Sequence, residues 1–152
     1  MKYDDASWHY GGNFPEGLPD EAGGTHIGMF VCWAILRGLV GSIHTDDFSE
    51  MLERLRQRQM TPGAWFMAAC DEKFTDEDLN DEGNMFAQAY FADPNGGLGT
   101  YLDDYTVTFS EVSETYAVPD TWESFERLKP ILDRRFDDWK SPKPKGWRKF
   151  FQ

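Results

Sequence analysis

Basic residues are scarce in this sequence, which has 15 Lys and Arg against 27 Asp and Glu and a formal net charge of −12. A body with this charge repels phosphate backbones, so we expect no nucleic-acid partner. Long apolar runs are also lacking, because Gly28, Arg37 and Gly38 interrupt the longest one, at 27–40. A membrane-spanning helix needs about 20 apolar residues. The sequence therefore predicts no membrane segment and no membrane partner.

Cysteine is nearly absent as well. Cys32 and Cys70 both lie in apolar surroundings, and no C-x-x-C pair is present for a redox or metal site. We expect two free thiols in a reducing compartment, with a disulfide between them as the open alternative. The first residues lack the basic and apolar regions of a signal peptide, so we predict a cytoplasmic protein.

Aromatic residues are abundant, at 16% of the chain, which favours a folded domain over disorder. Apolar residues recur at spacings of three and four in most segments. The sequence therefore predicts an all-α fold of five or six helices, with at most one minor strand or hairpin. We expect one compact domain at 1–140, beginning with an ordered arm at 1–20, and then a basic, aromatic tail at 141–152.

Capping and helix-breaking residues locate the helices. The expected ranges are a central helix at 21–40, then 46–59, 62–72, 75–91 and 120–139, with an ambiguous segment at 102–112 that favours a helix or irregular structure. Start signals occur at Thr45 or Asp46, at Thr61-Pro62, at Thr75 with Asp78, and at Asp120 or Thr121. Gly83 should weaken its helix by about 1 kcal/mol relative to Ala. Pro130 should kink or split the last helix.

The histidines His9, His26 and His44 lack the spacing of a metal-binding helix motif, so we predict no metal and no cofactor. The N-terminal arm is nevertheless long enough to bring Asp4, Asp5, His9 and His26 together. Such a cluster would suit a small hydrolase-like or metal-dependent enzyme, which is the alternative function that the sequence leaves open.

Other catalytic motifs fail at the positions that matter. The segment from Asp76 matches the first ligands of an EF-hand loop, but Asp81 and Ala87 replace the required Gly and Glu. A G-x-S-x-G elbow is absent, and neither cysteine has a basic neighbour in sequence that would activate it. The glycine-rich segment at 96–100 lacks the G-K-[ST] ending of a phosphate-binding loop.

Acidic residues cluster at 71–82, where seven acids accompany one lysine. A solvated face explains such a cluster, and so does a docking face for a basic partner, whose association an acidic field accelerates. The residues that we assign to a partner-binding face are Asp71, Glu72, Asp76, Glu77, Asp78, Asp81, Glu82, Asp103 and Asp104.

Two segments near the N-terminus resemble a known family. Residues 3–9 read YDDASWH and residues 25–30 read THIGMF. This pattern is similar to that of an uncharacterised family of small bacterial cytoplasmic proteins, and because that family has no established activity, the resemblance implies no catalytic residue. By type alone, a small acidic protein of this kind is similar to the immunity proteins that accompany secreted toxins. We therefore favour a non-enzymatic protein-binding domain that neutralises a basic toxin, such as a nuclease, through its acidic surface.

Overall fold

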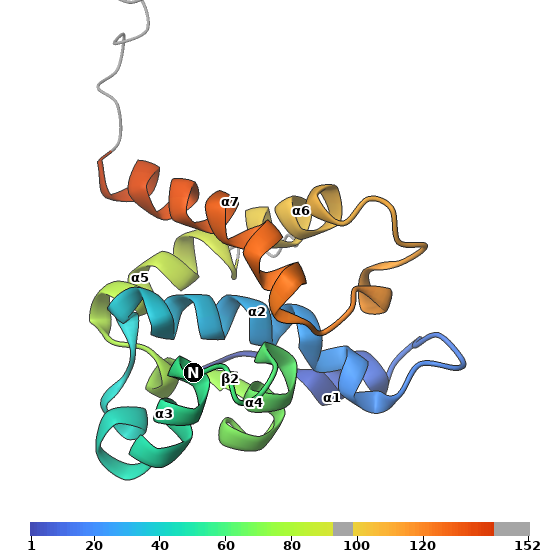
Figure 1. The fold of residues 1–152 in the computed structure, drawn as a ribbon. Helices are drawn as coiled ribbons and strands as arrows, with labels where there is room; N and C mark the ends of the chain where they lie inside the picture. The colour runs from blue at the N-terminus through green and yellow to red at the C-terminus, as the bar shows by residue number, and fades with distance from the viewer. Residues whose placement is uncertain (93–98, 142–152) are drawn as a thin grey trace, which may run out of the picture.

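The computed structural model describes residues 1–92 and 99–141. Helices lie above and below one central helix, α2 (Thr25–Ala34), and a short two-stranded sheet lies near the N-terminus (Figure 1). The predicted helical class with a minor hairpin is confirmed, but the expected count of five or six helices is too low, since the described residues form seven α-helices, α1 to α7. The glycine-rich segment at 93–98 and the tail at 142–152 lie outside the described residues, so their predictions stand as made.

The central helix is buried on all sides. All ten residues of α2 are buried, which explains why its sequence is apolar on nearly every face. The helix is shorter than the predicted 21–40. A 3₁₀ turn, η1 (Asp20–Gly24), precedes it, and a π-helical turn, η2 (Ile35–Leu39), follows it. Gly38 ends this helical run because its φ of 92° lies in the left-handed region that favours glycine.

Helices α3 (Ser49–Arg56) and α4 (Pro62–Ala69) come next, and α4 packs across α2. The start predicted at Thr61 is confirmed, since the Thr61 side chain accepts a hydrogen bond from the backbone N–H of Ala64. The start predicted at Thr45 or Asp46 is wrong. Both residues lie inside a π-helical turn, η3 (Ile43–Asp47), and α3 begins after Phe48 without a side-chain cap.

The capping box predicted at Thr75 and Asp78 is present, but it starts one 3₁₀ turn, η4 (Asp76–Asp78), and not the long helix. The following helix, α5 (Asp81–Tyr90), begins after Asn80, whose side chain accepts a hydrogen bond from Gly83 N–H. Leu79 separates the two helices because its backbone is extended and bridges to Val40. A tertiary contact therefore divides the helix that the local pattern predicts as continuous.

The N-terminal arm is ordered, as predicted, and it contributes a strand. Strand β1 (Lys2–Asp5) pairs antiparallel with β2 (Lys73–Thr75), and helix α1 (Ala6–Tyr10) follows β1 directly. Both strands are too short to show a period of two in the sequence, so only the open possibility of one minor strand or hairpin anticipated them. The sheet joins the arm to the segment between α4 and α5.

The C-terminal part contains α6 (Gly99–Thr108), a 3₁₀ turn η5 (Thr115–Ala117) and α7 (Trp122–Lys140). The predicted helix or irregular structure at 102–112 is confirmed as the end of α6 and a following turn, and Thr121 caps α7 as predicted. Pro130 does not split α7, which runs through it as one helix packed on α2 and α6 (Figure 1). Buried Leu128 and Leu132 on either side of Pro130 hold both halves against the core.

Aromatic rings fill the core around Phe30 of α2. The rings within about 6 Å of Phe30 are those of Trp33, Phe74, Phe86, Tyr90, Phe91 and Tyr101. This cluster joins α2, β2, α5 and α6 into one hydrophobic core. No helix in the described ranges is long and apolar enough to cross a membrane.

Candidate active site

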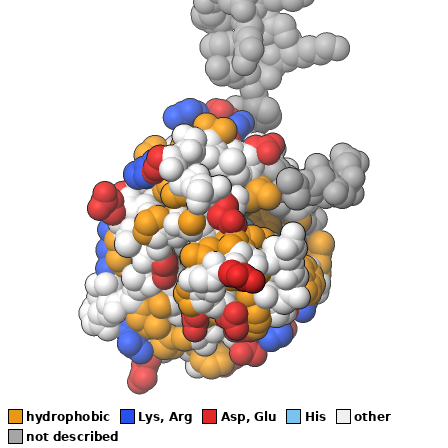
Figure 2. Space-filling view, turned by 90° about the vertical axis from the view of Figure 1, so that its right-hand side faces the viewer, with side chains coloured by type: hydrophobic (Ala, Val, Ile, Leu, Met, Phe, Trp, Pro, Cys, Tyr) orange, Lys and Arg blue, Asp and Glu red, His pale blue; other side chains and the backbone are white. Residues whose placement is uncertain are grey.

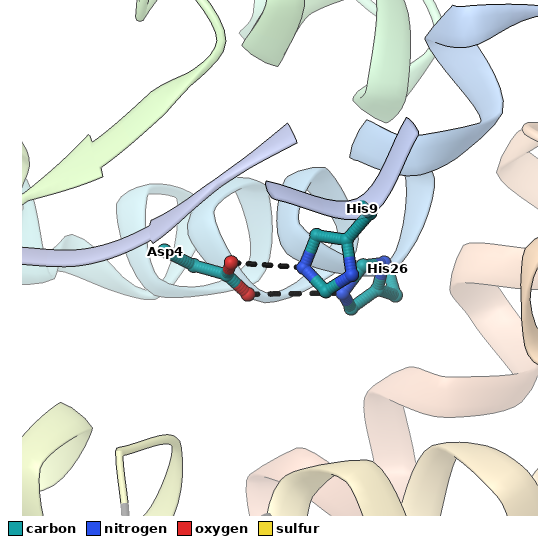
Figure 3. Close-up of side chains that lie close together, drawn as sticks. All are labelled: Asp4, His9 and His26. Carbon is teal, nitrogen blue, oxygen red and sulfur yellow. Dashed lines mark hydrogen bonds and ion pairs between the residues drawn. The ribbon is translucent and has the colours of Figure 1, made fainter. Parts of the chain in front are cut away.

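Three of the four residues that the sequence suggested as a concealed site lie together. Asp4 comes from β1, His9 from α1 and His26 from the first turn of α2. The two carboxylate oxygens of Asp4 face the two imidazole rings (Figure 3). Asp4 Oδ1 lies 2.9 Å from His9 Nε2, and Asp4 Oδ2 lies 3.7 Å from His26 Nε2. The cluster is therefore one carboxylate shared by two histidines.

Asp5, the fourth residue of the predicted site, has a different role. Its carboxylate caps α1 by accepting hydrogen bonds from the backbone N–H and the hydroxyl of Ser7, at 2.9 and 2.7 Å. The same carboxylate pairs with Lys2 Nζ at 2.8 Å. Successive side chains of a strand point to opposite faces, so Asp4 faces the histidines while Asp5 does not. The placement of Asp5 in the site was thus wrong.

One hydrogen bond from a histidine and one longer contact hold the cluster together. Asp4 accepts hydrogen bonds from His9 Nε2 and from Asp5 N–H, while His26 Nε2 lies beyond hydrogen-bond distance. His9 Nδ1 is then an acceptor for the hydroxyl of Tyr116, at 2.7 Å. His26 Nδ1 is a buried nitrogen with no hydrogen-bond partner in the described residues. One nitrogen of the cluster is therefore both covered and unpaired.

Burial and hydrogen bonding shift the two central groups in a consistent way. Burial acts to raise the pKa of Asp4, but interactions with His26 and His9 outweigh it and lower that pKa to about 2. Burial lowers the pKa of His26, which is 5% exposed, and Asp4 opposes this effect only in part. At neutral pH the site consequently combines an ionised carboxylate with a neutral imidazole.

A cavity of about 500 Å³ opens beside the two histidines. Besides His9 and His26, its lining includes Tyr105, Tyr116 and Glu114 from α6 and from the segment containing η5. The Tyr105 hydroxyl is buried and has no hydrogen-bond partner in the described residues, and burial raises its pKa, so it is a proton donor. Buried polar groups are normally paired. His26 Nδ1 and the Tyr105 hydroxyl are exceptions, and both belong to residues that line this cavity.

Sequence reasoning missed Tyr105, Tyr116 and Glu114. Tyr105 lies in the ambiguous segment at 102–112, where its ring had only the signal of a core aromatic. His9 and Tyr116 are separated by 107 residues and touch only because η5 returns to α1. No local spacing in the sequence encodes that contact.

A second cluster lies between η3, the end of α4 and η4. His44 Nε2 is 2.8 Å from Asp78 Oδ1 and 4.0 Å from Cys70 Sγ. Burial, followed by the charge of Asp78, raises the pKa of the Cys70 thiol well above its ordinary value. Cys70 is therefore a protonated thiol and not an activated nucleophile. Cys32 and Cys70 are both free, as expected.

Each of the two clusters offers three possible metal ligands. The ligand atoms of Asp4, His9 and His26 all lie within 4.8 Å of one another, and the same holds for His44, Cys70 and Asp78. Two imidazoles and a carboxylate form a common set for catalytic zinc or non-haem iron. The carboxylates of both sets also accept a backbone hydrogen bond, Asp4 from Asp5 N–H and Asp78 from Thr75 N–H.

The predicted acidic face is only partly a surface. Its exposed members are Asp71, Asp76, Glu77, Asp81, Glu82 and Asp103. Asp78 is buried and binds His44, so its placement on a surface was wrong. Asp104 is largely covered by Tyr90 and Arg135, which both bind its carboxylate. Glu72 is half-buried and accepts a hydrogen bond from the Tyr10 hydroxyl.

The fold and the site define a mostly helical domain that carries a buried carboxylate–imidazole cluster at the edge of a cavity. Residues 2–118 match the family described as a domain of unknown function, DUF7832, and the chain belongs to that family. The matched range contains Asp4, His9, His26 and the residues that line the adjacent cavity. No curated protein and no solved structure matches the chain.

Proposed function

We propose that the protein is a small hydrolase in which His26 is the general base. The observation that carries this proposal is the imidazole of His26, which lines a cavity, has its Nε2 3.7 Å from Asp4 and has a buried Nδ1 without a hydrogen-bond partner in the described residues. A carboxylate behind an imidazole orients the ring and stabilises the imidazolium that forms when the opposite nitrogen takes a proton. The contact of 3.7 Å is long for a hydrogen bond, and such contacts often tighten when substrate binds.

The proposed reaction is hydrolysis of an ester or amide in the cavity. His26 Nδ1 takes a proton from a water molecule, whose oxygen forms a bond to the carbonyl carbon. The Tyr105 hydroxyl donates a hydrogen bond to the carbonyl oxygen, where negative charge develops. As the bond to the leaving group breaks, that group receives the proton from His26. His9, held by Tyr116, fixes the Asp4 carboxylate between the two rings.

A panel of p-nitrophenyl esters and anilides tests the proposal, with purified wild type compared with His26→Gln and Tyr105→Phe. We expect His26→Gln to lower kcat at least about 100-fold and Tyr105→Phe to lower it about 10- to 100-fold. Glu50→Gln, at an exposed position of α3, is the control and should leave the rate unchanged. Equal rates in His26→Gln and wild type would contradict the proposal.

Treatment with EDTA separates this mechanism from the metal-dependent one that the ligand set also allows. Activity that survives EDTA supports His26 as the base. Activity that EDTA abolishes and zinc restores would instead support the metal-dependent mechanism, with Asp4, His9 and His26 as the ligand set beside the cavity if their variants lose zinc binding. In that case His26 could not act as the base through the same cluster.

A second candidate function is the binding of a basic protein toxin, as an immunity protein does. It is supported by the exposed acids Asp81 and Glu82 on α5, which lie beside Met85, a large apolar side chain that is 62% exposed. Exposed apolar side chains next to charges of one sign are typical of docking surfaces. The two free cysteines support the cytoplasmic, reducing location that this function needs.

Affinity capture from the native host tests this second candidate. A toxin partner should be recovered by the wild-type protein and lost by the double variant Asp81→Lys, Glu82→Lys. Recovery of the same partner by both proteins, or of none by either, would count against the acidic surface as the docking site.

A further inference from the structure

The cavity beside His26 is adjacent to a second one, of about 610 Å³, and Tyr116 and Val118 line both. The second cavity lies between η1, α4 and η5, and its apolar surface comes from side chains such as Leu18, Ala22 and Met67. Each volume falls in the range that takes a drug-sized molecule or a portion of a peptide. The pair therefore forms two neighbouring subsites on one side of the molecule.

Acidic residues are the only charged residues that line these subsites besides the histidines, within the part of the chain that the structure describes. Glu114 lines the first cavity, and Glu21, Glu72 and Asp120 line the second. Among residues 1–92 and 99–141, no Lys or Arg lines either cavity. Figure 2 views the molecule from the side of η5, and it shows acidic side chains among hydrophobic ones, with Lys and Arg toward the margins. A cation is therefore favoured on this side, and an anion is opposed.

The partial positive charge at the N-terminus of α4 does not make the second cavity favourable for an anion. Helix α4 begins at the second cavity, where its free N–H groups would attract an anion. Asp120 already accepts hydrogen bonds from Gly63 N–H and Ala64 N–H, at 2.8 and 3.1 Å. The helix terminus is thereby neutralised from within the chain. Glu21 is exposed, so its charge is available to a ligand in the cavity.

On the basis of the proposed function, we infer that the substrate is a small amide or peptide with a basic side chain. The carbonyl group lies in the first cavity, which is lined by His26 and Tyr105, two residues that each carry a buried polar atom without a hydrogen-bond partner in the described residues. The guanidinium or ammonium group lies in the second cavity, near Glu21 and Glu72. Tyr116 and Val118 lie between the two groups.

Calorimetric titration with benzoyl-arginine amide tests the substrate class. Benzoyl-citrulline amide, which has nearly the same shape without the charge, is the matched control ligand. We expect wild type to bind the arginine probe about tenfold more tightly than the citrulline probe, and we expect salt to reduce the difference. Equal affinities, or tighter binding of the citrulline probe, would overturn the inference.

Variants of the second cavity locate the effect. The double variant Glu21→Gln, Glu72→Gln should bind the two probes with affinities within about twofold of each other. The pair that each glutamate forms with the guanidinium is weak by itself, so both glutamates are replaced together. The preference should be unchanged in Glu50→Gln, which lies on α3 away from both cavities. A preference that survives in the double variant would contradict the assignment of Glu21 and Glu72.

The same experiments separate this inference from the proposed hydrolysis. Selective binding of the arginine probe without any turnover of esters or amides would support the cationic subsite and contradict the hydrolase. Turnover that depends on His26, with no preference for arginine over citrulline, would support the hydrolase and contradict the cationic subsite.

Discussion

At the scale of single residues, the site favours the ionised form of Asp4 and the neutral form of His26. The ionised form of Asp4 is favoured, with a pKa of about 2, because its interactions with His26 and His9 outweigh the effect of burial. The charged form of His26 is disfavoured by burial, which lowers its pKa. A carboxylate that stays ionised beside an imidazole that stays neutral is the combination that general base catalysis at neutral pH requires.

The same shifts predict how stability depends on pH. Between the lowered pKa of His26 and its ordinary value of 6.5, the unfolded chain binds more protons, so the free energy of unfolding should fall as pH drops below 6.5. The stabilisation from ionised Asp4 is present above 3.8 and is lost as pH falls toward 2, at a cost of about 2 kcal/mol. Urea unfolding across this range measures both steps.

Two variants assign the two steps. His26→Gln should remove the decrease that begins at 6.5, and Asp4→Asn should reduce the decrease below 3.8. Part of the acid decrease should remain in Asp4→Asn, because the pKa of Asp5 is also lowered to about 2, where hydrogen bonds from Lys2 and Ser7 outweigh its burial. Unchanged pH profiles in both variants would contradict the roles given to these groups.

Asp78 and its neighbour Glu77 provide a second prediction at the residue scale. Asp78→Ala leaves buried His44 and the Thr75 N–H without their partner, so it should destabilise the fold by about 2–4 kcal/mol. Glu77→Ala, at an exposed position, should change the stability by less than about 0.5 kcal/mol. Chemical denaturation of both variants makes the comparison. Similar stabilities would mean that Asp78 belongs to the surface, as its sequence context suggested.

At the scale of secondary structure elements, helix N-caps could be predicted from the sequence, whereas helix interruptions caused by tertiary contacts could not. Thr61 and Thr121 act where the sequence placed them, because an N-cap depends on bonds within three residues. The extended backbone at Leu79 depends on a bridge to Val40, on a segment 39 residues earlier, and no local pattern contains it. The candidate site shows the same division. Asp4, His9 and His26 were identified by residue type, whereas Asp5 was excluded only by the strand geometry.

A substitution of Gly83 in α5 tests the difference between local helix propensity and tertiary packing. Helix propensity alone predicts that Gly83→Ala stabilises α5 by about 1 kcal/mol. The structure predicts the opposite sign, because an added Cβ would lie 3.0 Å from the Cβ and the carbonyl oxygen of Leu39 and from Leu79 Cβ. We expect a loss of about 1–3 kcal/mol by thermal or urea unfolding. Gln88→Ala, on the exposed side of α5, is the control and should be neutral. A stabilised Gly83→Ala variant would show that η2 can move away from α5.

At the scale of the whole molecule, the net charge of −12 acts on stability as well as on partners. Most ion pairs of the described residues are at least partly exposed, such as Arg58–Glu126 and Arg127–Glu111, and contribute little. We therefore expect repulsion among the excess acids to outweigh attraction between pairs. Salt screens both, so raising NaCl from about 10 mM to about 200 mM should raise the melting temperature, by about 2–5 °C.

The choice of salt concentration makes this result specific to charge. Below about 0.2 M, NaCl acts mainly by screening, so the increase should level off as the Debye length falls below the spacing of surface charges. Replacing Glu77 and Asp81 with Lys lowers the excess of acids and should reduce the salt effect, with little change in fold because both side chains are exposed. A melting temperature that falls with salt would mean that exposed ion pairs stabilise this acidic fold more than its net charge destabilises it. Circular dichroism at both concentrations distinguishes the two cases, since they predict opposite signs.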